Sequence, residues 1–495
     1  MARQEPQELT QEARELLRRR LEGAVTAAPT VAEAAPRRPP LSLAQRRLWF
    51  IDRLTQGSLA YNVAASYRLS GPLDPDALDS AVRFVARRHD VLRTHFEADG
   101  DAEPYQVVSE APPRGLERHD LSAGDDPSEG ARALARAAAD TQFDLDRGPL
   151  FRTWLAKLGP ADHVLGLVVH HTLFDRESLE VWAGEVSAAY AAYVQHLEPG
   201  LAPLPAQYAD YAVWQHRSMA GPRLDAETRH WRERLRGVPS ILELPADHDR
   251  PATPTYRAGA VPVAVPGAVA ADLRKLTEAG QASLFMTGLA AFQGLLSRYT
   301  ASADVIVGCP FNGRTQVRFE GLIGFFANSL PIHADLGDDP SFAELLRRTR
   351  ETMLEAHEHQ DVPFDRIVQE VAPPRDLGRN PLFQVWFDLS GGSTDAASGL
   401  LGLGQVEASF FNEGRVRTRF DLELHLNEES GGGLGGRLLY ARDLLEDETA
   451  RTFVDHYQAF LAAVAVNPHQ RISEVPIFSA DQLRTILVDW GTAAP

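Results

Sequence analysis

The chain has 495 residues, too many for one ordinary hydrophobic core, so we expect two or more folded units. Hydrophobic residues make up 44% and charged residues 24%, as in soluble globular proteins, and no apolar run approaches the roughly 18 residues of a membrane span. The formal net charge of −18 argues against broad nucleic-acid binding, which needs a basic surface. One cysteine, Cys309, excludes an internal disulfide framework, and residues 1–20 lack the apolar core of a signal peptide. These features predict a cytoplasmic protein.

In chain order, the first predicted element is a helix over residues 9–21, where apolar side chains recur at helical spacing. An Ala- and Pro-rich linker follows to residue 40, and the chain is then dense in apolar residues to about residue 476. Prolines cluster over residues 217–262, which predicts an internal boundary, and residues 390–404 form a glycine-rich break. The polar end, residues 487–495, suggests a piece of a longer polypeptide.

Strands and helices alternate along the apolar region. Residues 163–169 (HVLGLVV) and 304–308 (DVIVG) are typical of buried strands, and residues 420–426 alternate as a strand does. Residues 178–194, with Ser178 as a cap, and residues 342–358 predict helices. Alternating strands and helices predict an α/β fold.

The chemically informative segment is HHTLFD (residues 170–175), which directly follows the first of these strands. Neighbouring strand residues point to opposite faces, so one metal ion would not be chelated by both His170 and His171, and no Cys or Glu stands at ligand spacing. We therefore expect no metal. Two interpretations stay open from the residues alone: two hydrogen-bonded structural histidines, or one neutral imidazole acting as a general base near pH 7.

Seven segments, in order, resemble the condensation domains of non-ribosomal peptide synthetases, a family in the chloramphenicol acetyltransferase-like superfamily. HHTLFD matches the His-His-x-x-x-Asp core of that superfamily. The other six are LSLAQRRLWF (residues 41–50), RHDVLRTHF (88–96), YADYAVWQ (208–215), IGFFANSL (323–330), HQDVPF (359–364) and RDLGRNPLF (375–383). The resemblance covers roughly residues 40–480.

The resemblance implies two chloramphenicol acetyltransferase-like α/β sandwich lobes, residues 41–220 and 221–480, arranged as a V-shaped pseudo-dimer around a central tunnel. Residues 1–40 resemble the helix and linker that follow an upstream carrier domain, and residues 481–495 the linker toward an adenylation domain. The implied reaction forms an amide: a carrier-bound acyl or peptidyl thioester passes to the α-amine of a carrier-bound aminoacyl group. Both substrates would arrive on 4′-phosphopantetheine arms of partner carrier domains, and the chain would bind no cofactor itself. We expect a monomeric unit within a multidomain chain that makes a natural product such as a siderophore.

Residue roles follow from the resemblance. His171 matches the histidine thought to accept the amine proton or to position the amine, and the sequence does not choose between the two. Asp175 matches a structural aspartate, and we expect it to pair with Arg93 of the second motif. We expect His170 to point into the lobe as a structural residue, because strand alternation turns it away from His171. Asn328 either lines the tunnel or holds a turn.

Arg176 departs from the family pattern, in which glycine usually follows the motif aspartate. Arginine adds a long stem and a permanent charge at the tunnel. Three interpretations stay open: a gate, a contact for pantetheine or substrate, or loss of activity. The alternatives to condensation are thus a catalytically inactive docking platform, an epimerisation domain that shares the His-His core, and a free-standing acyltransferase using coenzyme A. HQDVPF and RDLGRNPLF favour condensation over epimerisation, and the intact His pair excludes a heterocyclising relative.

Overall fold

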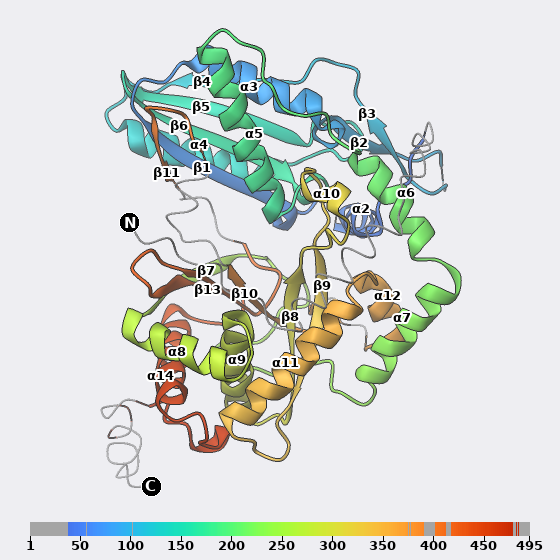
Figure 1. Cartoon of the computed structure of the whole chain (residues 1–495), viewed down its shortest axis with the longest axis vertical. Coiled ribbons are helices and arrows are strands. Elements are labelled where there is room, and N and C mark those ends of the chain that lie inside the picture. Colours follow the sequence, from blue (N-terminus) through green and yellow to red (C-terminus); the bar gives the residue numbers. More distant parts are fainter. Residues whose placement is uncertain are drawn as a thin grey trace, which may run out of the picture.

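The structure is a computed structural model of the chain (Figure 1). It describes residues 38–478 except 56, 101, 375, 377, 391–400 and 412–416, together with residues 482 and 484. The helix predicted over residues 9–21, most of the linker before residue 40, most of the glycine-rich break and the polar tail lie outside the described residues.

A mixed five-stranded sheet forms the first lobe, with the strand order β11-β1-β6-β5-β4. Helices α3 and α5 pack against each other and against this sheet in one core, while α4 packs against β1, β5 and β6 in a separate, smaller cluster. Gly166 in β6 makes the packing on the α4 side possible, because a Cβ atom there would lie 2.0 Å from the Trp154 ring. The strands are β1 (Asn62–Ser70), β4 (Leu116–Asp120), β5 (Phe151–Gly159), β6 (Asp162–His170) and β11 (Glu407–Phe410), and a side ribbon joins β2 (Thr94–Glu97) to β3 (Tyr105–Val108). The helices are α2 (Leu43–Thr55), α3 (Pro75–Arg88), α4 (Pro127–Ala139), α5 (Arg176–Val194) and α6 (Tyr208–Ser218).

A mixed six-stranded sheet forms the second lobe, with the order β7-β13-β12-β10-β8-β9. A layer of helices that includes α8, α9, α11 and α14 lies on the side of this sheet away from the first lobe, so the opposite face of the sheet is turned toward the first lobe (Figure 1). The strands are β7 (Ala258–Val265), β8 (Asp304–Phe311), β9 (Asn328–Asp335), β10 (Val385–Ser390), β12 (Leu422–Glu428) and β13 (Leu434–Ala441). The helices are α7 (Gly221–Arg234), α8 (Gly267–Ala279), α9 (Leu284–Thr300), α10 (Val317–Glu320), α11 (Phe342–Glu358), α12 (Phe364–Val371) and α14 (Asp447–Val466). Short 3₁₀ segments are η1 (Leu59–Tyr61), η2 (Asp90–Arg93), η3 (His171–Leu173) and η4 (Ile472–Glu474).

Each lobe has its own hydrophobic core, yet two segments of the second half of the chain belong to the first core. Phe319, Leu322 and Phe326, in the segment between β8 and β9, pack among residues of α3, α5 and α6. The strand β11 pairs antiparallel with β1. Two segments from the second half of the chain are therefore part of the first lobe. Dividing the chain at residue 220 would not separate the two cores.

The predicted α/β class is confirmed, as are the five elements predicted within the described residues, with one correction. The strands over residues 163–169, 304–308 and 420–426 correspond to β6, β8 and β12, and the helix over residues 342–358 is α11. The helix α5 begins at Arg176, and its N-cap is Asp175, whose side chain accepts a hydrogen bond from the Ser178 backbone N–H. The prediction that Ser178 caps this helix is wrong. In the described part of the chain, no helix combines the length and apolar character that a membrane crossing needs.

Candidate active site

His171 stands at the point where β6 ends and a single 3₁₀ turn begins. Its Nδ1 lies 2.6 Å from the carbonyl oxygen of Phe174. A carbonyl only accepts, so Nδ1 carries the ring proton and Nε2 keeps its lone pair. Among the described residues, no hydrogen bond uses this Nε2. The imidazole is half-buried, and its centroid lies 4.4 Å from the centroid of the Phe325 ring. The ring can therefore accept a proton or a hydrogen bond from a ligand.

The pKa of His171 is lowered to about 4. Burial is the largest cause, the positive charges of Arg419 and Arg47 lower the pKa further, and the Phe174 carbonyl and Asp175 oppose them in part. At neutral pH the imidazole is uncharged. A base whose conjugate acid has so low a pKa accepts a hydrogen bond from an amine more readily than it takes a full proton.

His170 lies on the other side of the strand end, as expected, and is fully buried between the rings of Tyr61 and Phe143. Its Nδ1 lies 2.9 Å from Oγ1 of Thr172 and accepts from the Thr172 backbone N–H. Burial and the neighbouring His171 lower its pKa to about 3. No group of three or more metal-ligating side chains is found among the described residues.

Asp175 is buried at the centre of a hydrogen-bond network. Its two carboxylate oxygens each accept from the guanidinium of Arg314 at 2.9 Å, and Arg314 is itself only 2% exposed. The carboxylate also accepts from the backbone N–H groups of Ser178 and Phe326, at 2.9 and 3.0 Å. Burial alone would raise the pKa of Asp175, but the charge and hydrogen bonds of Arg314 outweigh it and lower the pKa. Asp175 thus ties the His171 loop to the segment between β8 and β9.

The predicted pairing of Asp175 with Arg93 is wrong. Arg93 donates instead to the Ala86 carbonyl, the Ser109 carbonyl and the Asp90 carboxylate, at 3.1, 2.8 and 2.6 Å. These acceptors surround the end of α3, so the donors of Arg93 are used in holding that helix end. Arg314 lies outside every family-like segment and 139 positions from Asp175, so no sequence signal marked it.

Several of the family-like segments meet around His171. Gln45 of the first segment donates to the Thr172 carbonyl at 2.9 Å. The Tyr208 hydroxyl of the fourth donates to the Phe325 carbonyl of the fifth at 2.6 Å. The ring of Phe325 in turn packs on His171. Segments far apart in sequence therefore fix one loop, and Gln45 and Tyr208 do so by donating to backbone carbonyls.

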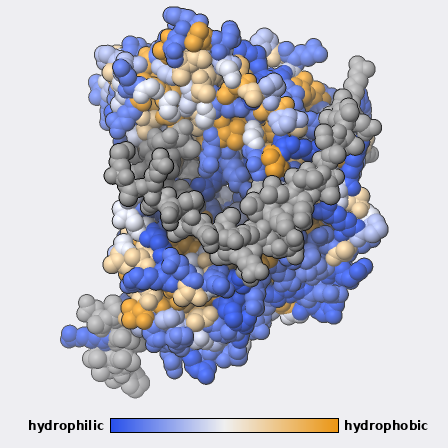
Figure 2. All heavy atoms as spheres, viewed as in Figure 1, coloured by the Kyte–Doolittle hydropathy of each residue, from blue (hydrophilic) through white to orange (hydrophobic). Residues whose placement is uncertain are grey.

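A cavity of about 1280 Å³ lies between the lobes. Leu43, Arg47 and Tyr61 line it from the first lobe, and Arg250, Phe364 and Arg419 from the second. Arg47 and Arg419, which line this cavity, both lower the pKa of His171 through their positive charges. On the face in Figure 2 the surface is hollowed between the lobes, and the atoms visible inside are mainly hydrophilic.

Arg176 is exposed and reaches from the start of α5 to the second lobe, where Nη1 donates to Oγ of Ser390 at the end of β10. Its neighbour Glu177 lies 3.2 Å from Nη1 of Arg314 and does not pair with Arg176 in the described contacts. The position that departs from the family pattern thus forms a bridge between the lobes, one residue after Asp175.

Asn328 holds a turn. Its Nδ2 donates to the carbonyls of Gln360 and Val362, at 3.0 and 2.7 Å, and its Oδ1 accepts from the Phe364 backbone N–H at 3.2 Å. Asn328 also borders a small pocket that includes Arg47, but it is not among the residues that line the cavity between the lobes, so its lining of the tunnel stays a prediction.

Comparison with known proteins identifies the family. The family model described as "Condensation domain" matches residues 37–487. The chain belongs to the condensation domain family. It is 38% identical to one of the subunits of linear gramicidin synthase from Brevibacillus parabrevis over 479 residues, and 37% identical to Phosphinothricin tripeptide synthetase PhsC of Streptomyces viridochromogenes over 484. Those matches cover 96% of this condensation domain in both cases, but only 6% and 44% of the relatives, so the chain spans a part of the length of the synthetases it matches.

Solved structures agree with this assignment. The X-domain from teicoplanin biosynthesis superposes with a TM-score of 0.81 at 32% identity, over 90% of this chain and 98% of that one. The condensation domain of the Monacolin K polyketide synthase MokA superposes with a TM-score of 0.77 at 24% identity, over 88% and 98%. The second likeness concerns the fold alone. Together they confirm the predicted chloramphenicol acetyltransferase-like fold.

Proposed function

We propose that this condensation domain forms a peptide bond between two carrier-bound substrates. The observation that carries the proposal is the neutral His171, whose Nε2 is unprotonated and whose pKa is lowered by two arginines that line the cavity between the lobes. The cavity is large enough for two extended substrates, and we take it as the tunnel that the family resemblance implies.

In the proposed reaction, the acceptor α-amine attacks the donor carbonyl carbon, the carbon–nitrogen bond forms and the carbon–sulfur bond breaks. The thiol of the donor arm leaves, and the proton lost by the amine balances the thiolate. Nε2 of His171 accepts a hydrogen bond from the amine and orients its lone pair toward the carbonyl. Because a thioester is already a reactive acyl donor, holding both groups in one place supplies most of the acceleration, and effective molarities in oriented reactions reach about 10⁵–10⁸ M.

The proposed partners are an upstream donor carrier and a downstream acceptor carrier, each bringing a 4′-phosphopantetheine arm, with an adenylation domain next to this domain in the longer chain. The multidomain synthetases among the relatives support this arrangement. The domain itself would need no cofactor.

The test is reconstitution with one donor-loaded and one acceptor-loaded carrier, followed by mass spectrometry of both arms. Condensation predicts that the acceptor arm gains the donor acyl mass only when both loaded carriers are present. An unchanged mass with an inverted α-carbon on one arm would indicate epimerisation instead. No change on either arm, with several carrier pairs, would contradict both activities.

A second candidate, a docking platform for another enzyme, is favoured by one finding. A solved complex pairs the teicoplanin X-domain with OxyB, and that X-domain superposes on this chain with a TM-score of 0.79 at 32% identity. Arg176, at a position where the family usually has glycine, agrees with this alternative. It predicts tight binding of a partner enzyme together with no product in the reconstitution above.

A further inference from the structure

The sheet of the second lobe presents charged side chains toward the first lobe. Along β12, Leu422, Leu424 and Leu426 point into the core below, so Glu423 and His425 point the other way. In the neighbouring strand β13, Leu438 belongs to the core and Arg437 lies on the opposite face, with its Cα paired to that of His425. Since the helices cover the other side of the sheet, this charged face looks toward the first lobe (Figure 1).

The charged face adjoins the candidate active site. Ser390, two residues after Asp388 on β10 and hence on the same face, receives the hydrogen bond from Arg176. The Glu423 carboxylate accepts from the backbone N–H of Arg419 at 3.3 Å, and the Arg419 charge acts on His171. The bridge from Arg176 to Ser390 thus joins this face to the start of α5, next to the loop that carries His171.

The carboxylates of the face already have partners. Glu423 lies 2.9 Å from Nε2 of His425 and 2.5 Å from Oγ1 of Thr418, and Asp388 lies 3.9 Å from Nδ1 of His425. Burial alone would lower the pKa of His425, but Asp388 and Glu423 raise it to about 9, so the imidazole is charged at neutral pH. Glu423, Asp388 and His425 thus form a compact group that carries one surplus negative charge.

Arg437 stands beside this group without a partner. No hydrogen bond or ion pair joins its guanidinium to any described residue, and the side chain is exposed. Partial desolvation on this face lowers its pKa, and the negative charge of Glu423 opposes that effect. With Arg419, whose guanidinium lies over the Tyr61 ring, three cations face two carboxylates here. A guanidinium whose donors have no partner among the described residues is suited to a planar anion that accepts two hydrogen bonds.

We propose that Arg437, beside His425, is a subsite that binds a carboxylate on the side chain of a carrier-bound substrate. The inference rests on the proposed function and names its substrate class: an acidic residue, such as an aspartyl group, on one of the two arms. The phosphate of the pantetheine arm could accept the same hydrogen bonds from Arg437. The experiment therefore tests the side-chain carboxylate and the phosphate separately.

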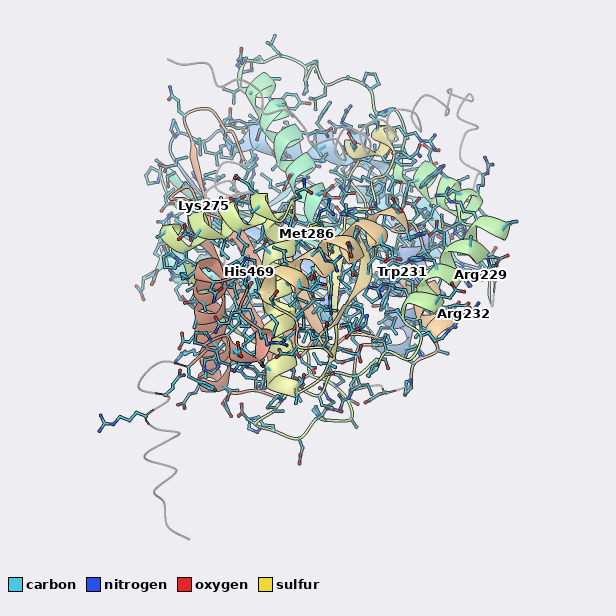
Figure 3. The ribbon with its side chains drawn as sticks, turned by 60° about the horizontal axis from the view of Figure 1, so that its bottom comes forward. Arg229, Trp231, Arg232, Lys275, Met286 and His469 are labelled. Carbon is cyan, nitrogen blue, oxygen red and sulfur yellow. The ribbon has the colours of Figure 1, made fainter. Side chains whose placement is uncertain are left out.

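The first measurement is calorimetric binding of stable amide analogues, aspartyl- and asparaginyl-aminopantetheine, which differ only in one carboxylate against one amide. We expect the aspartyl analogue to bind about tenfold more tightly to the wild-type domain, since charge-assisted hydrogen bonds are roughly twice as strong as neutral ones. Arg437→Gln should abolish that preference. The matched control is Lys275→Gln, which removes one positive charge from α8 on the outer side of the same lobe (Figure 3) and should keep the preference.

Equal binding of both analogues by the wild type would overturn the inference. So would an equal loss for both analogues in Arg437→Gln, or a loss of binding to 4′-phosphopantetheine alone, because the ligand would then be the arm and not the side chain.

Condensation assays separate this inference from the proposed function. With aspartyl and asparaginyl groups loaded in either position, Arg437→Gln should lower the yield from the aspartyl substrate by about tenfold and leave the asparaginyl yield unchanged. Product from both substrates without discrimination in the wild type would reject the subsite alone. Discrimination in binding without any product would reject the proposed condensation and leave the subsite standing.

Discussion

At the residue scale, the buried pair of Asp175 and Arg314 constrains the His171 loop. Removing one member of such a pair leaves an uncompensated charge, so Asp175→Asn and Arg314→Gln should each lower the free energy of unfolding by about 3–5 kcal/mol. The double variant should lose less than the sum of the two, since each single change leaves the other member of the pair as an uncompensated charge and the double change leaves neither. Urea denaturation measures all three.

The matched control for this pair is Asp272→Asn, which breaks an exposed contact with Lys275. It should change the free energy of unfolding by no more than about 1 kcal/mol. Variants at Asp175 that are as stable as the wild type and yet inactive would contradict the structural role and point to direct chemistry.

The pH dependence of condensation tests the state of His171. Its pKa of about 4 means that the imidazole is neutral throughout pH 5.5–9, so it adds no acid limb near its ordinary value of 6.5. The acceptor α-amine, with a pKa of about 8, should set the only limb in this range, and the rate should rise with pH until the amine is unprotonated. Single-turnover rates with two acceptors of different amine pKa should show a limb that moves with the acceptor. A fixed inflection near pH 6.5 would refute this account of His171.

At the scale of elements, Asn328 links the start of β9 to the turn before α12. Asn328→Ala removes both donors to the carbonyls of Gln360 and Val362. Each buried carbonyl left unpaired costs about 1–3 kcal/mol, so the melting temperature should fall by several degrees. Asn328→Asp retains the acceptor for the Phe364 N–H but loses the donors, so its melting temperature should fall as well.

Activity of the remaining folded fraction separates the two hypotheses for Asn328. If this residue holds only the turn, folded Asn328→Ala at low temperature should condense at the wild-type rate. A rate loss with intact folding would mean that Asn328 contacts substrate.

Helices and strands were predictable from the sequence where the local pattern of apolar residues alone determines the element. The apolar run of β6 and the periodicity of α11 predicted both elements to within a residue. The start of α5 was not, because Asp175 and Ser178 are both good caps and only the tertiary position of Asp175, beside Arg314, selects it.

At the scale of the whole molecule, contacts between the lobes escaped prediction. The pairing of Arg314 with Asp175 depends on a segment of the second half of the chain entering the first core, and no local pattern encodes that crossing. The ordered family-like segments predicted the fold and the place of His171, since they carry information from the whole family. They carry none about Arg176, where this chain departs from the pattern.

The bridge from Arg176 to Ser390 leads to a prediction about access to the cavity. Arg176→Gly, which restores the usual family residue, and Arg176→Ala should both keep condensation with native carriers, because a guanidinium that stays protonated cannot take the amine proton. Loss of the bridge should admit bulkier acceptors. Yields on a panel of loaded carriers measure this, and inactivity of both folded variants would show that Arg176 contacts a substrate.

The central claim is that His171 orients the acceptor amine for amide formation. Its most direct test is the mass of the acceptor arm after a single turnover, for the wild type and for His171→Ala, with circular dichroism and melting curves to establish equal folding. We predict that the wild type adds the donor acyl group to the acceptor and that the variant is slower by about 10²-fold, the effect expected when a reacting group is misplaced by ~1 Å. A well-folded His171→Ala that forms the product at the wild-type rate would contradict the claim.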